Sequence, residues 1–329
     1  MRLELLVLLL VLWLLARAIA RRKRRAFSFD NTVVVITGAA SGIGRALAHK
    51  VFQEALDVTL VLLDIDTKAL VSLQATLLES QDATGAKRVR IYECNKKNEI
   101  GSNGVADGVN RTVDVTVARI LDDVAPKHIG VLINNADLKP EQIRKTFAVN
   151  TFAHFWMVQA TLPSLQKASK ALIVTMSSVM GMTSSAGLTD YCASKAAVNA
   201  FHEALRLELW RDNVNSIQTL LVCPAGVNTN MFAGILQADD WAVQIARYCI
   251  PQLEETDVAT LIYRSMCRGD ELLVSCFSGW RGVAFSWAPL LARMLPVSLY
   301  DIVIRFGGGL HGMDTFVGKG ETREDTIIE

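Results

Sequence analysis

A tyrosine and a lysine stand four residues apart near the middle of the chain, at positions 191 and 195. They open a segment with helical periodicity, so both side chains would share one helix face and the ammonium could lie near the phenol. A nearby positive charge favours the ionised phenol and lowers its pKa. Tyr191 is therefore a candidate general acid or base near neutral pH, with Lys195 adjusting its pKa.

Ser178 precedes this pair and follows directly after an apolar segment at 171–175. That segment has the length and composition of a buried strand, so the serine would lie just past a strand end, where its hydroxyl could bond to a substrate oxygen. Each of the three residues, taken singly, would more often be an ordinary surface side chain. Together they are candidates for an acid–base site in which the Ser178 hydroxyl meets a substrate oxygen.

A glycine-rich segment, Thr-Gly-Ala-Ala-Ser-Gly-Ile-Gly, occupies residues 37–44 between a predicted strand and a predicted helix. Its glycines allow a tight turn and a close backbone approach, so that the helix amino terminus can hold a pyrophosphate. The residues predicted to form this phosphate site are Gly38, Ser41, Gly42, Ile43 and Gly44.

Asp64 ends the second predicted strand, 20 residues after Gly44. A carboxylate at this place can accept hydrogen bonds from the adenosine ribose hydroxyls and repel a 2′-phosphate. The sequence thus predicts NAD as the cofactor, with NADP also possible. The alternative is that Asp64 and Asp66 only form a turn.

The elements that would position these residues alternate between short apolar runs and helical patterns from residue 32 onward, which is typical of parallel α/β proteins. We predict strands at 32–36, 58–63, 88–92, 131–133, 171–175, 216–222 and 272–275. We predict helices at 43–55, 67–79, 113–124, 141–166, 191–210 and 257–268, with a polar loop over 95–110. The expected fold is α/β, a single doubly wound parallel sheet of the Rossmann type.

The amino-terminal residues 1–25 combine an unbroken apolar run at 5–16 with five consecutive basic residues at 21–25. The run is short for a spanning helix, which needs about 20 residues. A cleaved signal peptide would carry its charge before the apolar run. We therefore expect a membrane anchor, either spanning or inserted in one leaflet, with the basic residues on the cytosolic side against anionic lipid headgroups.

The composition limits the other functions. The chain has 51% hydrophobic and 20% charged residues and a net charge of +1, which fits a folded core and gives no basic footprint for nucleic acid. Its six cysteines form no C-x-x-C pair, so we predict no metal site and a reduced compartment. We expect three parts: the anchor at 1–25, a catalytic domain at 26–275, and an extension at 276–329 with a polar tail.

The extension is rich in aromatic and apolar residues between 277 and 295, interrupted by Arg281 and Arg293. Three interpretations remain open for it: a lid over a greasy substrate, ordinary core packing, or an amphipathic segment at a membrane interface.

Taken in order, these motifs resemble the short-chain dehydrogenase/reductase family over about residues 30–275. The resemblance rests on the glycine loop at 37–44, Asn134-Asn135-Ala136, Asn150, Ser178 and the Tyr191–Lys195 segment. The sequence segments at 149–156, 191–195 and 222–232 are similar to those of the membrane-associated retinol dehydrogenase and 17-beta-hydroxysteroid dehydrogenase branch. Members of that branch act on lipophilic alcohols at the endoplasmic reticulum or lipid droplets.

The resemblance implies a role for each matching residue. Tyr191 would be the acid or base, Ser178 would hold the reacting oxygen, Lys195 would bind the nicotinamide ribose, and Asn150 would hold a water that links Lys195 to solvent. The cofactor contacts implied are Asn95 at the adenine, Asn134 and Ala136 beside the dinucleotide, and Thr229 at the carboxamide, besides Tyr191 and Lys195.

The expected function is an NAD(P)-dependent oxidoreductase that interconverts a retinoid, steroid or other lipid alcohol and its carbonyl. It would sit on the endoplasmic reticulum or lipid droplets, face the cytosol, contact membrane lipid, and could form a homodimer. Asp137 replaces a family glycine, and the 137–150 segment is short. These departures keep one alternative open, a non-catalytic lipid-associated scaffold with weakened dinucleotide binding. A second alternative is an NADPH-preferring carbonyl reductase, against which Asp64 argues.

Overall fold

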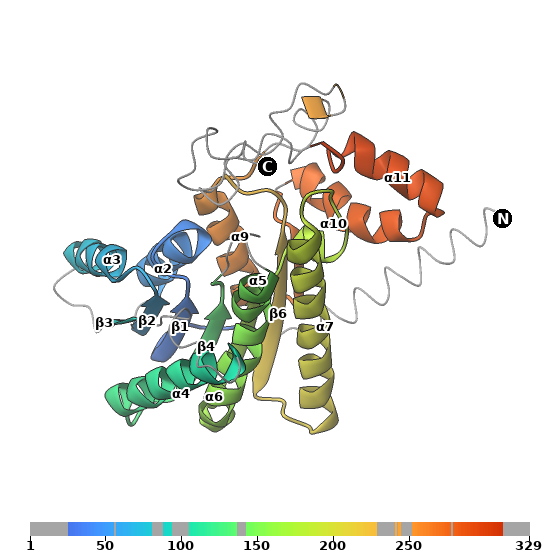
Figure 1. Ribbon diagram of the computed structural model, residues 1–329. Helices are drawn as coiled ribbons and strands as arrows, with labels where there is room; N and C mark the ends of the chain where they lie inside the picture. Colours follow the sequence, from blue (N-terminus) through green and yellow to red (C-terminus); the bar gives the residue numbers. More distant parts are fainter. Residues whose placement is uncertain are drawn as a thin grey trace, which may run out of the picture.

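Seven parallel strands form one sheet in the order β3-β2-β1-β4-β5-β6-β7, as the computed structural model shows (Figure 1). It describes residues 26–55, 57–80, 88–93, 105–136, 143–228, 241, 243–244, 252–277 and 279–311. The strands are β1 (Thr32–Thr37), β2 (Val58–Asp64), β3 (Arg88–Glu93), β4 (Ile129–Asn134), β5 (Ala171–Met176), β6 (Ile217–Pro224) and β7 (Leu272–Ser275). The predicted doubly wound Rossmann sheet is confirmed.

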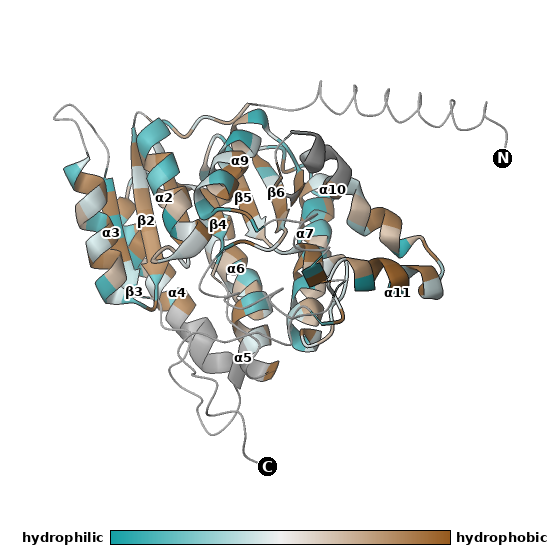
Figure 2. Cartoon of the chain, turned by 90° about the horizontal axis from the view of Figure 1, so that it is seen from above, coloured by the Kyte–Doolittle hydropathy of each residue, from teal (hydrophilic) through white to brown (hydrophobic). Residues whose placement is uncertain are grey.

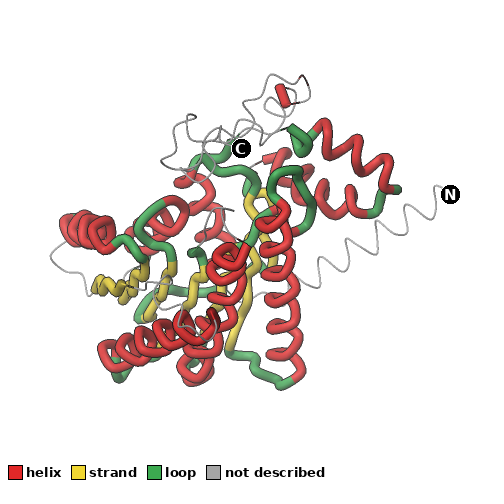
Figure 3. Tube along the Cα trace, in the orientation of Figure 1, coloured by secondary structure: helices red, strands yellow, loops and turns green. Residues whose placement is uncertain are grey.

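Helices cover both faces of this sheet, as the view from above shows (Figure 2). On one face lie α2 (Gly42–Glu54), α3 (Thr67–Glu79) and α9 (Glu255–Arg268); on the other lie α4 (Val105–Val124), α6 (Ala153–Lys167) and α7 (Thr189–Arg211). A helical hairpin of α10 (Gly279–Arg293) and α11 (Val297–Phe306) follows β7 at one edge. Helix and strand thus alternate along the chain (Figure 3).

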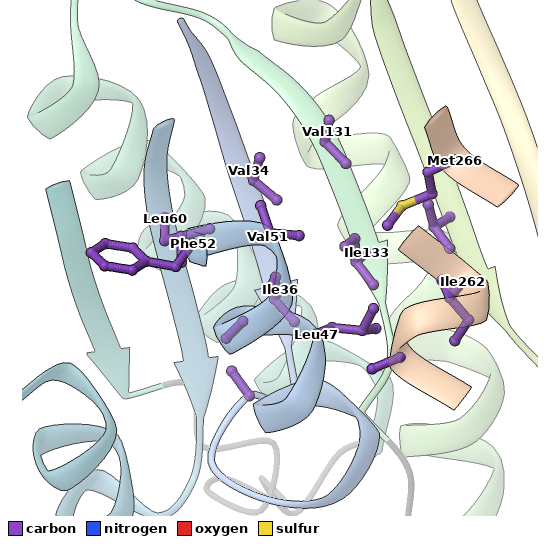
Figure 4. Packing of buried hydrophobic residues seen from close by; sticks show 14 of the residues in the cluster. Val34, Ile36, Leu47, Val51, Phe52, Leu60, Val131, Ile133, Ile262 and Met266 are labelled. Atoms are coloured by element: carbon purple, nitrogen blue, oxygen red, sulfur yellow. The ribbon is translucent and has the colours of Figure 1, made fainter. Parts of the chain in front are cut away.

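The central strands β1, β4 and β5 are largely apolar because both of their faces are buried, whereas the edge strand β3 carries charged residues and is partly exposed. Successive side chains of a strand point to opposite faces, so Val34 and Ile36 pack into the core beneath α2 and α9, whereas Val33 and Val35 pack beneath α4, α6 and α7. Figure 4 shows the first of these clusters, where Leu47 of α2 and Ile262 of α9 lie over the sheet.

The helix α4 begins at Val105, within the segment 95–110 that was predicted to be a loop. Valines recur every four residues from 105 to 117, so the apolar helical stripe extends further toward the amino terminus than the polar residues between them suggested.

The single helix predicted at 141–166 is interrupted. It consists of α5 (Ile143–Phe147), the π-helical turn η1 (Ala148–Phe152) and α6. A π turn holds one residue more than an α turn and occurs often at functional sites. The hydrophobic periodicity of the sequence does not reveal such a turn.

Within the described residues, no helix is both long and apolar enough to cross a bilayer. The anchor predicted at 1–25 lies outside the described residues, as does the predicted polar tail.

One buried polar contact joins α7 to the sheet. The His202 Nδ1 lies 2.9 Å from the Thr175 Oγ1 of β5, and the imidazole is buried. Burial, assisted by the nearby Arg206 charge, lowers the pKa of His202 to about 4. The ring is therefore neutral in the native state at and below neutral pH, down to about pH 4.

Because the buried His202 is neutral, we expect the folded protein to lose stability at acid pH. The unfolded imidazole has its ordinary pKa of 6.5, so between pH 6.5 and 4 the unfolded state binds a proton that the native state does not, and stability falls as the pH falls. At pH 4.5 the loss from His202 should be on the order of 2–3 kcal/mol. Urea unfolding at pH 7 and 4.5, with His202→Gln as the non-titrating control, measures it. An identical pH dependence in both proteins would contradict the prediction.

Candidate active site

The strand order reverses between β1 and β4, and ligands of doubly wound sheets bind in the crevice at the carboxyl ends of such strands. The glycine loop follows β1, and Asn134 ends β4 beside it. Ser178 follows β5, the next strand of the sheet. The fold therefore brings the separate sequence motifs to one edge of the sheet.

The glycine loop is too closely packed for larger residues. A Cβ atom at Gly44 would lie 2.1 Å from the Gly38 carbonyl oxygen and 2.5 Å from the Asn135 Nδ2. Gly38 has a φ of +65°, and a Cβ there would lie 2.7 Å from the Ala136 Cα. The helix α2 can approach the ends of β1 and β4 this closely because Gly38 and Gly44 lack a side chain.

Two polar side chains lock the loop to β4. The Thr37 Oγ1 accepts hydrogen bonds from the backbone nitrogens of Asn135 and Ala136, at 3.0 and 3.1 Å. In return the Asn135 Nδ2 donates to the Thr37 and Gly38 carbonyl oxygens, each at 3.1 Å. The sequence analysis did not assign Thr37 or Asn135 to the site, although the adjacency of their two motifs in the sheet would have placed them face to face.

The start of α2 offers backbone donors for an anion. Ser41 is the N-cap residue, its side chain makes no capping hydrogen bond in the described structure, and the first turn holds no acidic residue. An uncapped helix amino terminus is suited to bind phosphate. Nearby, the buried Asn134 Nδ2 has no hydrogen-bond partner among the described residues. The glycine cradle, these donors and this amide together fit a dinucleotide.

Asp64 lies beside this loop. Its Oδ2 accepts from the Ala40 backbone nitrogen at 2.9 Å, and its Oδ1 accepts from the Asp66 nitrogen at 3.1 Å. The carboxylate is therefore fixed in orientation by the glycine loop and by the start of α3. Carboxylate oxygens can each accept more than one bond, so ribose hydroxyls could still be bound.

Tyr191 and Lys195 lie in the first turns of α7, as predicted, and both are buried. The Lys195 Nζ lies 5.6 Å from the centre of the Tyr191 ring and donates to the Met176 carbonyl oxygen at 3.4 Å. A buried ammonium is costly without such partners. The end of β5 thus holds a positive charge beside the phenol.

Ser178 lies in the short link between β5 and the 3₁₀ turn η2 (Val179–Gly181), where its Oγ accepts from the Met180 nitrogen at 3.1 Å. Because the oxygen is the acceptor in this bond, the hydroxyl hydrogen can be donated to another oxygen. The turn packs tightly on α7: a Cβ at Gly181 would lie 2.7 Å from the Lys195 carbonyl oxygen. Serine and lysine are thus held at a fixed separation.

Asn150 lies fully buried in the π turn η1. Its Nδ2 donates to the Ser194 Oγ at 3.3 Å, and that hydroxyl donates to the Tyr191 carbonyl oxygen at 2.8 Å. The structure therefore brings Asn150 to the helix that carries Tyr191 and Lys195. The link through Ser194 was missed from the sequence, because serine inside a helix has no distinguishing signal.

Three residues discussed from the sequence lie outside the described residues: Asn95, Asp137 and Thr229. Cys192 beside Tyr191 is buried, and burial raises the pKa of its thiol. Burial also raises the pKa of Cys223, to about 12. Both thiols are protonated at neutral pH, which fits packing rather than nucleophilic chemistry.

Comparison with known proteins agrees with this arrangement. A family model described as short chain dehydrogenase matches residues 32–240. The chain is 34% identical over 246 residues to human retinol dehydrogenase 10, covering 68% of this chain and 70% of that protein. It is 30% identical over 298 residues to human epidermal retinol dehydrogenase 2, covering 87% and 85%.

Solved structures show the same fold. A short-chain dehydrogenase/reductase from Burkholderia phymatum, solved in complex with NAD, aligns with a TM-score of 0.62 and 25% identity over 84% of this chain and 96% of that one. A Streptomyces avermitilis short-chain dehydrogenase aligns with a TM-score of 0.61 at 22% identity, over 83% and 97%. The matched family model, these relatives and the shared sheet agree: the chain belongs to the short-chain dehydrogenase family and is an oxidoreductase of CH–OH groups.

Proposed function

We propose that this protein is a membrane-anchored oxidoreductase that interconverts a lipophilic alcohol and its carbonyl with a nicotinamide dinucleotide, preferably NAD. The observation that carries the proposal is the buried Tyr191 and Lys195 pair on α7, packed through η2 against Ser178 at the carboxyl edge of the sheet. When bound, the dinucleotide would accept or supply hydride.

The chain's own residues would handle the proton and the reacting oxygen. Ser178 would donate its hydroxyl hydrogen to the substrate oxygen and so hold it near Tyr191. The Tyr191 phenolate oxygen would take the proton of the alcohol during oxidation, and the resulting phenol would return it to the carbonyl oxygen during reduction. Lys195 would stabilise the phenolate by its charge and bind the nicotinamide ribose. Asn150 would hold a water that links Lys195 to solvent.

The cofactor would lie across the ends of β1 and β4. Gly38, Ser41, Gly42, Ile43 and Gly44 would surround the pyrophosphate, Asn134 and Ala136 would lie beside the dinucleotide, and Asn95 and Thr229 would contact its adenine and carboxamide. NAD is favoured because Asp64 stands where a ribose 2′-phosphate would meet its negative charge. The NAD complex of the Burkholderia relative supports a nicotinamide dinucleotide as the cofactor.

The retinol dehydrogenase relatives support a lipophilic substrate, a retinoid, steroid or other lipid alcohol. The apolar and basic residues 1–25 support anchoring on the endoplasmic reticulum or on lipid droplets, with the domain at 26–275 facing the cytosol. A panel of retinoids, steroids and long-chain alcohols, assayed with each cofactor, tests the proposal. Turnover of water-soluble alcohols alone would overturn the substrate class.

Replacing Tyr191 with phenylalanine keeps the ring and its packing but removes the titrating hydroxyl. Turnover should fall by at least about 10²-fold, as is typical when a general acid or base is lost. Cofactor affinity, measured by calorimetry, should stay near the native value. Near-native turnover of this variant would exclude Tyr191 from proton transfer.

The Asp64→Ala variant removes both a ribose acceptor and a negative charge. The preference for NAD should weaken and NADP should become a better substrate, as seen in the ratio of kcat/KM values for the two cofactors. Asp66→Ala is the matched control, since it removes a carboxylate two residues away. If the ratio stays unchanged in Asp64→Ala, the aspartate only shapes the turn.

Deleting residues 1–20 should release the protein from membranes under carbonate extraction. Burying each Leu or Val side chain contributes about 1.5–3 kcal/mol, whereas each basic residue near an anionic surface contributes about 1 kcal/mol. Neutralising residues 21–25 should therefore leave the protein bound but alter its orientation, which protease protection reports. A deletion variant that resists carbonate would contradict the amino-terminal anchor.

A further inference from the structure

The helical hairpin of α10 and α11 carries an unusual amount of exposed apolar surface. On α10, Trp287, Leu290 and Leu291 are exposed, and Met294 follows directly after the end of the helix at the same spacing of three and four residues. On α11 the same spacing holds for Leu299, Ile302, Val303 and Phe306. Side chains so spaced share one helix face. Each helix therefore presents an apolar stripe to its surroundings, and Met294 is 82% exposed.

Most of α11 lies outside the protein core. None of its residues is buried, and the hairpin projects from the β7 edge of the sheet, with α11 strongly apolar (Figures 1 and 2). Exposed apolar patches larger than a few hundred Å² are rare on monomeric soluble proteins and indicate an interaction site.

The charge of the hairpin indicates which partner covers this surface. Residues 279–311 contain Arg281, Arg293 and Arg305 against Asp301, a net charge of +2, whereas residues 26–329 hold 27 basic and 32 acidic residues, a net charge of −5. Arg305, three residues after Ile302, borders the apolar stripe of α11, with its guanidinium 5.7 Å from the centre of the Trp241 ring. Bulky aliphatic and aromatic side chains with arginine at the border are typical of helices that lie in a membrane interface, and anionic headgroups attract arginine.

The hairpin is also fastened to the segment between Ser178 and Tyr191. The Arg293 Nε donates to the Met182 carbonyl oxygen at 2.7 Å, and its guanidinium lies over the Tyr300 ring. The Tyr300 hydroxyl accepts from the Ser184 nitrogen at 3.1 Å. The Gly309 carbonyl oxygen accepts from the Ala186 nitrogen at 2.8 Å and from the Ser185 hydroxyl at 2.9 Å. A surface that binds the hairpin would therefore lie close to the segment between Ser178 and Tyr191.

From these observations we infer that the α10–α11 hairpin lies on an anionic lipid surface as a shallow second contact, separate from residues 1–25. Through Arg293, Tyr300 and Gly309, this contact holds the 182–186 segment, and with it the active-site edge, next to the lipid. A lipid-dissolved substrate could then reach Ser178 and Tyr191 without crossing water.

The full chain on phosphatidylcholine–phosphatidylserine vesicles allows a direct test by hydroxyl-radical footprinting and mass spectrometry. The double variant Leu291→Glu, Val303→Glu should stay on the vesicles through residues 1–25, while oxidation of Met294 rises severalfold and oxidation of the α3 side chains does not change. Val71→Glu, an equally exposed position on α3 at the opposite end of the sheet, is the matched control and should leave Met294 protected.

Two results would overturn the inference. One is equal oxidation of Met294 in the native chain and the double variant while both float with the vesicles. The other is protection of Met294 that fades when the native protein is diluted into more lipid, which would show that a second copy covers the hairpin. If the double variant does not fold, as judged by circular dichroism, Leu291→Glu alone repeats the comparison.

A second readout rests on the proposed function. The double variant should lose kcat/KM for a long-chain alcohol dissolved in the vesicles, while kcat/KM for a short water-soluble alcohol stays unchanged. Equal losses for both alcohols would contradict the coupling between hairpin and active site. Absence of any turnover would refute the proposed function and leave the footprinting result valid.

Discussion

The whole site depends on how closely α2 approaches the ends of β1 and β4. The Asn135 amide bridges two carbonyl oxygens of the glycine loop, and the Thr37 hydroxyl receives two backbone nitrogens in return. Gly44 has room only for a hydrogen atom at this junction. Because the strand order reverses here, this joint fixes the crevice into which the helix amino terminus points its backbone donors.

The pair that we propose to handle the proton, Tyr191 and Lys195, is buried beside the neighbouring strand. Lys195 and Tyr191 belong to one helix, but their environment comes from β5, which supplies the Met176 carbonyl oxygen, and from the π turn, which reaches the helix through Asn150 and Ser194. An ammonium in this position would be unfavourable in an inert protein. Here the buried ammonium lies beside a phenol, and a nearby positive charge favours the ionised form of a phenol.

The sequence was sufficient to predict the sheet, and to select several residues that the fold brings to one edge of it, because these depend on local patterns. Buried parallel strands read as continuous apolar runs, and Tyr191 and Lys195 are separated by one helical turn. The long-range contacts could not be read in this way. Asn135 and Ser194 act through partners on other elements: Asn135 lies in a recognisable motif, but its contacts depend on the pairing of β1 with β4, and Ser194 has no local signal at all. The first turns of α4 were missed because polar residues masked a four-residue valine repeat.

The π turn at Ala148–Phe152 has a geometric consequence for the helix that follows it. Each residue of an α-helix advances the side-chain direction by about 100°, so the extra residue in the turn rotates α6 relative to α5. With this rotation Met157, Val158 and Leu165 pack into the core against the sheet, whereas Thr146 before the turn bonds to Asp190 of α7. The residues before and after the turn therefore contact different surfaces in different directions. With one residue fewer in the turn, the segment could keep the contacts of α6 with the sheet or those of α5 with α7, but not both.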